Sequence, residues 1–111
     1  MEIKQSEKNG CSIIRISGKM DVHLVHKIEP EFNNIIQNLS SDTLVLDLSD
    51  VDYISSSALR IFVNALKICK DKEVKLKFCS LKPAVVKVLE LVEMLALFDV
   101  YPDLESAVKA V

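Results

Sequence analysis

The sequence contains few of the residues that catalytic loops and nucleic-acid sites usually require. Tryptophan is absent, and the only aromatic residues are two tyrosines and four phenylalanines, so a platform on which bases or sugars stack is not expected. Only two glycines are present, Gly10 and Gly18, and they form no glycine-rich loop for a phosphate group. The formal net charge is −2 and lysine and glutamate are scattered, which argues against nucleic acid as the main partner because no basic stripe exists.

Long apolar runs are also missing. No stretch approaches the roughly 18 apolar residues that a membrane-spanning helix needs, and the first residues, MEIKQSEKNG, lack the basic-then-apolar pattern of a signal peptide. Cysteine is scarce: Cys11, Cys69 and Cys79 are odd in number and form no CxxC pair, which predicts free, mostly buried thiols in a reducing compartment. We therefore expect a cytoplasmic protein that does not insert into a membrane.

Catalytic and metal sites have little support in the sequence. His23 and His26 lie three residues apart, but no nearby cysteine or third histidine accompanies them, so we interpret them as surface histidines rather than zinc ligands. A run of three serines, at 55–57, lacks the Gly-x-Ser-x-Gly elbow, and nothing marks either histidine as its general base. We expect a protein that is not an enzyme and that carries no cofactor.

The first third of the chain predicts a hairpin followed by a helix. Asn9-Gly10 tolerates the positive φ angles of a tight turn and separates two strands, at 3–8 and 11–17, the second of which ends at Gly18. Asp21 is then expected to cap a helix that is kinked at Pro30 and ends near Asn38. Its apolar residues have helical spacing: positions 24, 25, 28, 32, 35, 36 and 39.

The rest of the chain alternates between strands and helices. An apolar run at 43–48 predicts a strand covered on both faces. The helix after it should bury Leu59, Phe62, Val63, Leu66 and Cys69. The segments after that helix predict, in order, a strand at 73–78, a mostly buried helix with Pro83 in its first turn, a short edge strand at 97–100, and a helix from Leu104 to Ala110 capped by Asp103.

This order of elements predicts an α/β fold with a mixed, mostly parallel sheet of four or five strands packed with four helices. At 111 residues, half of them apolar, the chain is long enough for one domain with its own core, and no linker or repeat divides residues 1–111.

The stretch that joins the strand at 43–48 to the next helix has two interpretations. It is expected to pass through an acidic turn with Asp47, Asp50 and Asp52 before the serines. In the structural interpretation, Ser55 or Ser56 caps the helix through its side-chain oxygen. In the functional interpretation, a serine is reversibly phosphorylated, which adds about −1.5 to −2 charges at neutral pH. The helix dipole tolerates that charge, whereas a partner docked over the turn would meet a buried dianion.

Several motifs in this sequence resemble those of STAS domains. The run LVLDLSDVDYI at 44–54, followed by SSSAL at 55–59, resembles the central STAS motif. The segment SGKMD at 17–21 resembles the family's Gly-x-hydrophobic-Asp motif, and residues 89–100 and 103–107 resemble its C-terminal run. STAS domains are the anti-sigma factor antagonists of bacteria and their relatives in stress-signalling complexes and anion transporters. The resemblance covers nearly the whole chain and implies the STAS-type fold.

The resemblance also implies a function and a site. In the family the loop usually reads Asp-Ser-Ser/Thr-Gly-Leu, and its second hydroxyl residue is phosphorylated by an anti-sigma factor that is also a serine kinase. On this chain Ser57 is then the phosphoacceptor, with Ser56 a less favoured choice, and a phosphatase would reverse the modification. The unphosphorylated protein would bind the kinase and free a sigma factor. The implied partner-binding residues are Asp21, Asp50, Asp52, Ser55, Ser56, Ser57, Ala58 and Arg60.

Two residues depart from the family pattern. Ser55 stands where the family has its acidic residue, and Ala58 stands where it has glycine. We expect the lost carboxylate to weaken partner recognition, and the methyl group of Ala58 to crowd the surface that a kinase approaches. Asp21 either contacts a partner or only caps a helix. Two alternative functions stay open, because stand-alone STAS proteins also serve as subunits of lipid-trafficking ABC transporters or as scaffold subunits of signalling assemblies, without phosphoregulation.

Overall fold

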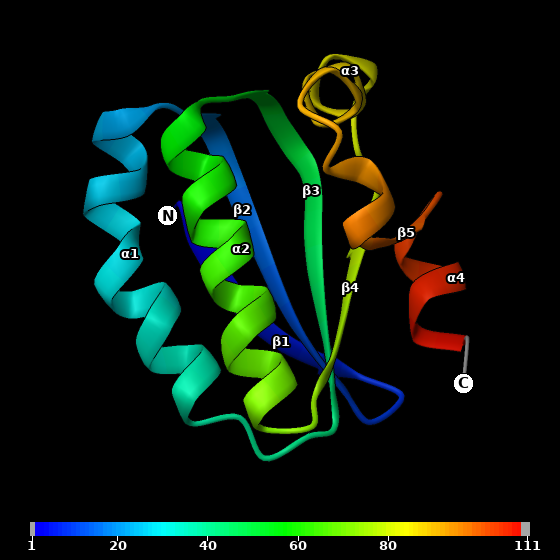
Figure 1. The fold of residues 1–111 in the computed structure, drawn as a ribbon. Coiled ribbons are helices and arrows are strands. Elements are labelled where there is room, and N and C mark those ends of the chain that lie inside the picture. The colour runs from blue at the N-terminus through cyan, green and yellow to red at the C-terminus, as the bar shows by residue number, and fades with distance from the viewer. Residues whose placement is uncertain (1, 110–111) are drawn as a thin grey trace.

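The computed structural model describes residues 2–109, which form a five-stranded sheet and four α-helices (Figure 1). The strands follow one another in the order β1-β2-β3-β4-β5, with β1 antiparallel to β2 and all other neighbours parallel. The predicted α/β fold with a mostly parallel sheet is therefore confirmed. In chain order the elements are β1 (Ile3–Lys8), β2 (Cys11–Met20), α1 (Val22–Gln37), β3 (Thr43–Ile54), α2 (Ser56–Asp71), β4 (Lys75–Cys79), α3 (Pro83–Leu91), a 3₁₀ turn (Leu95–Leu97), β5 (Asp99–Tyr101) and α4 (Leu104–Lys109).

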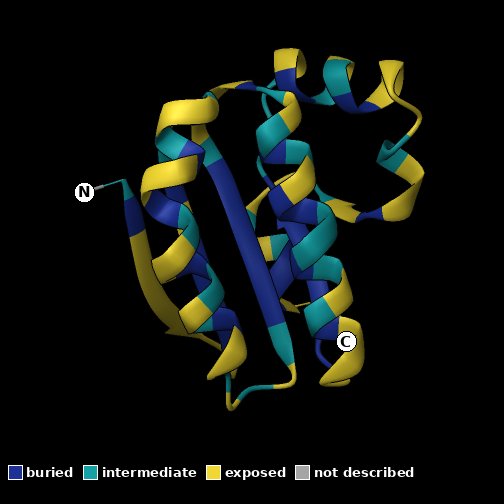
Figure 2. Ribbon diagram, turned by 60° about the vertical axis from the view of Figure 1, so that its left-hand side comes forward, coloured by how far each residue is buried: buried dark blue, intermediate teal, exposed yellow. Residues whose placement is uncertain are grey.

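The two faces of the sheet carry separate cores because side chains alternate along each strand. On β3, Leu44 and Leu46 face the larger core under α1, α2 and α3, whereas Val45 faces the smaller core under α4. The central strands are buried and the outer sides of the helices are exposed (Figure 2). All three thiols are buried and unpaired, as predicted: Cys11, Cys69 and Cys79.

The N-terminal hairpin forms as predicted, but its second strand is longer than expected. Asn9 and Gly10 both have positive φ angles, +52° and +78°, as a tight turn of this kind requires. The prediction that Gly18 ends β2 was wrong, because the strand continues to Met20. Gly18 adopts φ +116° at a shift in the pairing of β2 with β3, so it bends the strand instead of ending it.

Helix α1 is one helix with Pro30 inside it, as the spacing predicted. Asp21 is its cap, since its Oδ1 accepts a hydrogen bond of 2.9 Å from the backbone N–H of Leu24. The expected acidic turn after residue 48 is absent, because β3 runs on to Ile54. Its second half pairs with the extension of β2 and buries Val51 and Ile54. Asp50 and Asp52 therefore lie on a strand, not in a turn.

The buried side of α2 differs from the expected one. The buried residues are Ala58, Ile61, Phe62, Ala65 and Cys69. Leu59, Val63 and Leu66 are only half-buried, and of these Leu59 and Leu66 pack against the edge of the core. Since α2 has apolar side chains on most of its circumference, spacing alone did not show which line of them faces the sheet. The residues that pack against the sheet are those centred on Ile61 and Ala65.

The expectation that α3 is mostly buried was wrong. Only Val85 and Leu89 are buried, whereas Leu91 is 75% exposed and Val92 is 44% exposed. The helix has nine residues and lies at one end of the molecule (Figure 1), so only one side of it meets the core. Pro83 is in the first turn, as predicted.

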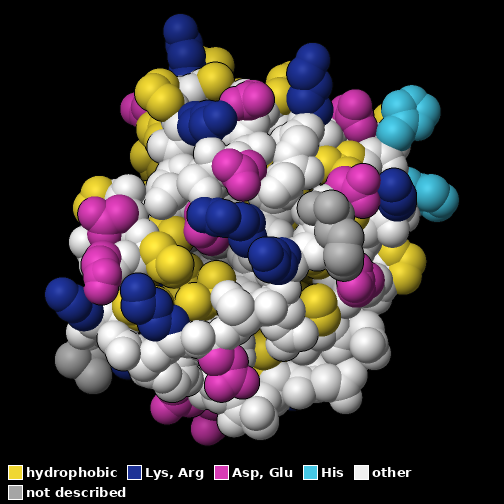
Figure 3. All heavy atoms as spheres, turned by 180° about the vertical axis from the view of Figure 1, so that it is seen from behind, with side chains coloured by type: hydrophobic (Ala, Val, Ile, Leu, Met, Phe, Trp, Pro, Cys, Tyr) yellow, Lys and Arg dark blue, Asp and Glu magenta, His cyan; other side chains and the backbone are white. Residues whose placement is uncertain are grey.

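The remaining elements lie close to their predicted positions. Strand β4 turns Leu76 and Phe78 to the larger core, and β5 is the expected short edge strand. Asp103 caps α4 by accepting a 2.8 Å hydrogen bond from the N–H of Ser106, while Ala110 lies outside the described residues. Basic and acidic side chains are interspersed on the face seen in Figure 3. Within residues 2–109 we find no helix with the length and apolar character needed to cross a bilayer.

Candidate functional site

The predicted site lies where α1 and α2 begin. The neighbouring parallel strands β2 and β3 end at the same edge of the sheet, and each leads directly into a helix (Figure 1). The backbone N–H of Ser55 donates a 3.0 Å hydrogen bond to the carbonyl oxygen of Met20, so the two chain segments are joined at this point. The structure thus brings Asp21 next to the serines, although 34 positions separate Asp21 from Ser55 in the sequence.

Ser55 is the cap of α2. Its Oγ accepts a 3.4 Å hydrogen bond from the N–H of Ala58 and donates one of 2.8 Å to the carbonyl oxygen of Met20. The structural interpretation of the serine run therefore holds for this one residue. A carboxylate in the place of Ser55 would keep the cap but would have no proton to donate to Met20.

Ser56 and Ser57 are the first two residues of α2 and have no capping role. Ser56 is exposed and Ser57 is half-buried. Within residues 2–109, neither hydroxyl makes a hydrogen bond. Both are therefore available for chemistry without breaking an existing contact.

Ala58 does not crowd the surface, contrary to our expectation. Its exposed fraction is 0%, and it belongs to the core under α1 and α2. The methyl group points into the protein because Ala58 is on the side of α2 that faces the sheet. Having alanine here instead of glycine leaves the outer face of the turn unchanged.

The two acidic residues of the predicted site lie in different places. Asp52 is exposed and forms an ion pair with Lys82, just before α3, which holds the pKa of Asp52 below its ordinary value. Asp50 accepts a hydrogen bond of 3.3 Å from Ser17 and lies 3.9 Å from Arg15. Arg15 lines a hollow on the α4 side of the sheet, so Asp50 belongs to the side opposite α2 and, within residues 2–109, makes no hydrogen bond with the serines at 55–57.

Arg60, one turn into α2, is held by a residue that the sequence did not point to. Its two terminal nitrogens donate hydrogen bonds of 2.7 and 2.9 Å to the two carboxylate oxygens of Glu29 on α1. This contact with Arg60 lowers the pKa of Glu29, and the hydrogen bond from Arg60 to Glu29 raises the pKa of the arginine. The pair links the two helices that flank the site.

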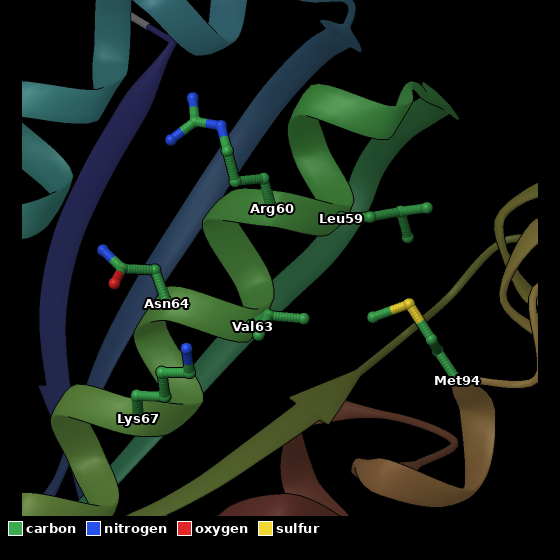
Figure 4. Close-up of a pocket in the computed structure, with 6 residues that line it drawn as sticks. All are labelled: Leu59, Arg60, Val63, Asn64, Lys67 and Met94. Carbon is green, nitrogen blue, oxygen red and sulfur yellow. The ribbon is translucent and has the colours of Figure 1, made fainter.

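A groove runs along the outer side of α2 next to the site. It has a volume of about 510 Å³ and is lined by Leu59, Arg60, Val63, Asn64, Lys67 and Met94. In Figure 4, Leu59 and Val63 point towards Met94, whereas Arg60 and Asn64 point to the other side of the helix. The apolar part of the groove therefore lies between α2 and Met94, whereas Arg60 and Asn64 make the other side of α2 polar.

Residues 2–109 offer no arrangement of three His, Cys, Asp or Glu side chains that is suited to a metal ion. His23 and His26 are both exposed on α1. The site is therefore a surface with free hydroxyl groups, ion pairs and an apolar groove.

Comparison with known proteins places the chain in a family. The model of the STAS domain matches residues 2–107. The anti-sigma F factor antagonist of Paenibacillus polymyxa is 26% identical over 99% of this chain and 92% of its own length. An anti-sigma factor antagonist from Mycobacterium paratuberculosis has a crystal structure with a TM-score of 0.86, 26% identity and coverage of 98% of this chain and 92% of that one.

A second solved structure shares the fold. It is an anti-sigma-factor antagonist (STAS) domain protein from Planctomyces limnophilus, with a TM-score of 0.87, 20% identity and coverage of 96% and 94% of the two chains. At that identity the likeness concerns the fold alone. Because the family model covers almost all of the sequence, the chain belongs to the STAS domain family.

Proposed function

We propose that this STAS domain is an anti-sigma factor antagonist that works in the cytoplasm as a single module over residues 1–111. It binds an anti-sigma factor that is also a serine kinase, frees a sigma factor, and is switched off when Ser57 is phosphorylated. The module is not itself an enzyme. The observation that carries the proposal is the position of Ser57, which begins a helix beside Asp21 and whose hydroxyl makes no hydrogen bond within residues 2–109. The antagonists from Paenibacillus polymyxa and Mycobacterium paratuberculosis, each 26% identical over nearly the whole chain, support it.

Ser57 is a better acceptor than Ser55 for a structural reason. The hydroxyl of Ser55 already caps α2 and donates to Met20, so modifying it would remove the hydrogen bond to Met20 and place a bulky group at the cap. At Ser57 the Oγ attacks the γ-phosphorus of ATP held by the kinase. The new Oγ–P bond replaces the bond from phosphorus to the bridging oxygen, ADP leaves, and the hydroxyl proton passes to a base on the kinase. Hydrolysis by a phosphatase restores the serine.

The modification acts on binding more than on folding. A phosphoserine carries about −1.5 to −2 charges at neutral pH, and the first turn of α2 is an electrostatically favourable place for a negative charge. A partner packed over Ser57 would instead have to desolvate that charge, which is costly without cationic groups of its own. The same group is therefore tolerated in the free protein and repelled in the complex.

The proposed docking surface consists of Asp21, Ser55–Ala58 and Arg60, with Asp52 at its margin. Asp50, which the sequence predicted to be part of it, is left out because it lies on the side of the sheet opposite α2. Ala58 supports it from below, since its side chain is buried. The groove with Leu59, Val63 and Met94 continues this surface along α2 and offers apolar contact area. A partner that covers the serines can therefore also bury apolar side chains close to them.

Incubation with the partner kinase and ATP should add the mass of one phosphate. The Ser57→Ala variant should lose this gain, whereas Ser56→Ala should keep it, because only Ser57 is the acceptor. Intact-mass spectrometry measures both. The Ser57→Asp variant should bind the kinase at least about tenfold more weakly, since a charge must be buried in the interface.

The partner is identified by pull-down from native lysate with mass spectrometry. A soluble kinase whose binding to Ser57→Asp equals its binding to the wild-type protein would contradict the switch. Copurification of an ATPase with membrane proteins would contradict the whole proposal and favour a subunit of a lipid-trafficking ABC transporter. A phosphate that persists in Ser57→Ala and disappears in Ser56→Ala would move the acceptor to Ser56.

A further inference from the structure

We propose that Arg60 exchanges partners when Ser57 is phosphorylated: its guanidinium leaves Glu29 on α1 and pairs with the new phosphoryl group on α2. This inference rests on the proposed modification of Ser57 and adds the response of the protein to it. It makes the Glu29–Arg60 ion pair the part of the fold that senses the switch.

The position of Arg60 along α2 puts it within reach of the modified serine. Residues three and four apart in a helix are neighbours on its surface, and Arg60 lies three residues after Ser57 and four after Ser56. Its side chain points away from Met94 (Figure 4) and reaches Glu29 on α1. Ser57 is therefore one turn from a long basic side chain that already lies along the gap between the helices.

The present pair can be exchanged without a large loss. The side chain of Arg60 is 59% exposed and that of Glu29 is 22% exposed. Because the guanidinium is well exposed, solvent screens much of the attraction between the two charges. A phosphoryl group has about twice the charge of a carboxylate and three acceptor oxygens. The planar fork of arginine binds a phosphate in two places as readily as a carboxylate.

Other charged groups near the site are less suited to take this role. Lys82 is engaged with Asp52. His26 on α1 lies close enough to Glu29 for its positive charge to lower the pKa of that carboxyl group, but Arg60 has the larger effect. Asp21, at the start of α1, is acidic and would oppose a phosphate. Arg60 is thus the charged residue whose place and partner best fit the exchange.

The exchange would change the surface in two places. The phosphoryl group adds negative charge at the start of α2, and Glu29 on α1 loses its counter-ion. The carboxylate of Glu29, which now pairs with Arg60, would then face solvent and any docked partner. A single modification therefore makes both flanks of the docking surface acidic.

The test needs no kinase, because phosphoserine can be incorporated at position 57 during synthesis of the full chain. The phosphorus NMR signal is followed against pH in the wild-type background and in Arg60→Gln. The second proton of the phosphate should dissociate roughly threefold to tenfold more readily in the wild-type background, since a nearby cation favours the dianion. High salt should reduce the difference, because the pair is exposed.

Two further variants sharpen the result. Lys67→Gln removes a positive charge that lies two turns of α2 beyond Arg60 and nearly three turns from Ser57, and it should leave the titration unchanged. Glu29→Gln removes the competing carboxylate, so the second proton should dissociate at least as readily as in the wild-type background. In the wild-type background, the carboxyl carbon of Glu29 should titrate at higher pH with phosphoserine than with serine, because the effect that now lowers its pKa is lost.

Equal phosphate titrations in the wild-type background and Arg60→Gln would overturn the exchange. An equal effect of Lys67→Gln and Arg60→Gln would also overturn it, because the cause would then be net charge. A Glu29 titration that phosphoserine leaves unchanged would show that the original pair persists. These outcomes are independent of the proposed function: a partner that never phosphorylates Ser57 would refute the function and leave the measured pairing as it is.

Discussion

Ser55 shows how a single hydroxyl can hold two helix starts together. It uses its lone pairs for the N–H of Ala58 and its proton for the carbonyl of Met20. Because an aspartate cannot donate a proton to that carbonyl, the serine at this position adds a link between β2 and α2 that the acidic residue of the family would not make. The lost carboxylate is therefore offset by a new contact in this chain.

We predict that Ser55→Ala lowers the free energy of unfolding by about 1–2 kcal/mol, because it removes a helix cap and the side-chain hydrogen bond to Met20, whose carbonyl keeps only the backbone N–H of residue 55. Ser55→Asp should cost less, since it keeps the cap and loses only the donor. Ser56→Ala is the matched control, within about 0.5 kcal/mol of wild type, because Ser56 is exposed and forms no cap. Urea unfolding measures all three. A loss in Ser56→Ala as large as in Ser55→Ala would refute the assignment of the cap.

At the scale of elements, sequence patterns succeeded where one segment determines its own structure. Asn9-Gly10 fixes a turn, Asp21 and Asp103 cap helices, and Pro83 begins one, each through local geometry. Sequence patterns failed where the structure of a segment depends on a neighbouring strand or helix. The continuation of β3 through Asp50 and Asp52 depends on its pairing with β2. The acidic residues alone suggested a turn, because the local sequence carries no information about that pairing.

The same reasoning explains what was predictable in the site. The serines and Asp21 were found from motifs in the chain, and Ser55 was one of two predicted caps. Glu29 was missed because it lies 31 positions before Arg60, and no local spacing connects them. The apolar groove was missed because Met94 is distant from α2 in the sequence and lies next to it only in the folded protein. The inward direction of the Ala58 side chain could not be predicted, because it depends on which apolar residues of α2 face the sheet.

Helix α3 allows a matched test of exposure within one element. Leu89 is fully buried and Leu91, two residues later, is 75% exposed. We predict that Leu89→Ala lowers the free energy of unfolding by about 2–5 kcal/mol, because it leaves a cavity in the larger core. Leu91→Ala should stay within about 0.5 kcal/mol of wild type. Chemical denaturation of both variants measures the difference, and equal losses would mean that Leu91 is covered in solution.

At the scale of the whole molecule, the sheet separates two cores and each contains a buried thiol. Cys69 lies in the larger core under α1 and α2, and Cys79 lies in the smaller core under α4. The pKa of each thiol is raised from 9.0 to about 11, mainly by burial, and for Cys79 the charge of Asp47 contributes to this rise. On both faces of the sheet, the environment therefore disfavours ionisation of the buried thiol to a thiolate.

This burial predicts a loss of stability in alkaline solution. Below pH 9 both thiols are protonated in the folded and unfolded states, so their contribution is constant. Between pH 9 and about 11 the unfolded chain releases these protons and the folded protein does not, which favours unfolding by on the order of 2 kcal/mol for each thiol.

Urea unfolding at pH 8 and pH 10.5 measures this fall in stability. Lysine and tyrosine residues titrate in the same range, so Cys69→Ala and Cys79→Ala are the reference. Each variant should show a smaller fall than wild type, and identical falls would show that the thiols reach water before the fold opens.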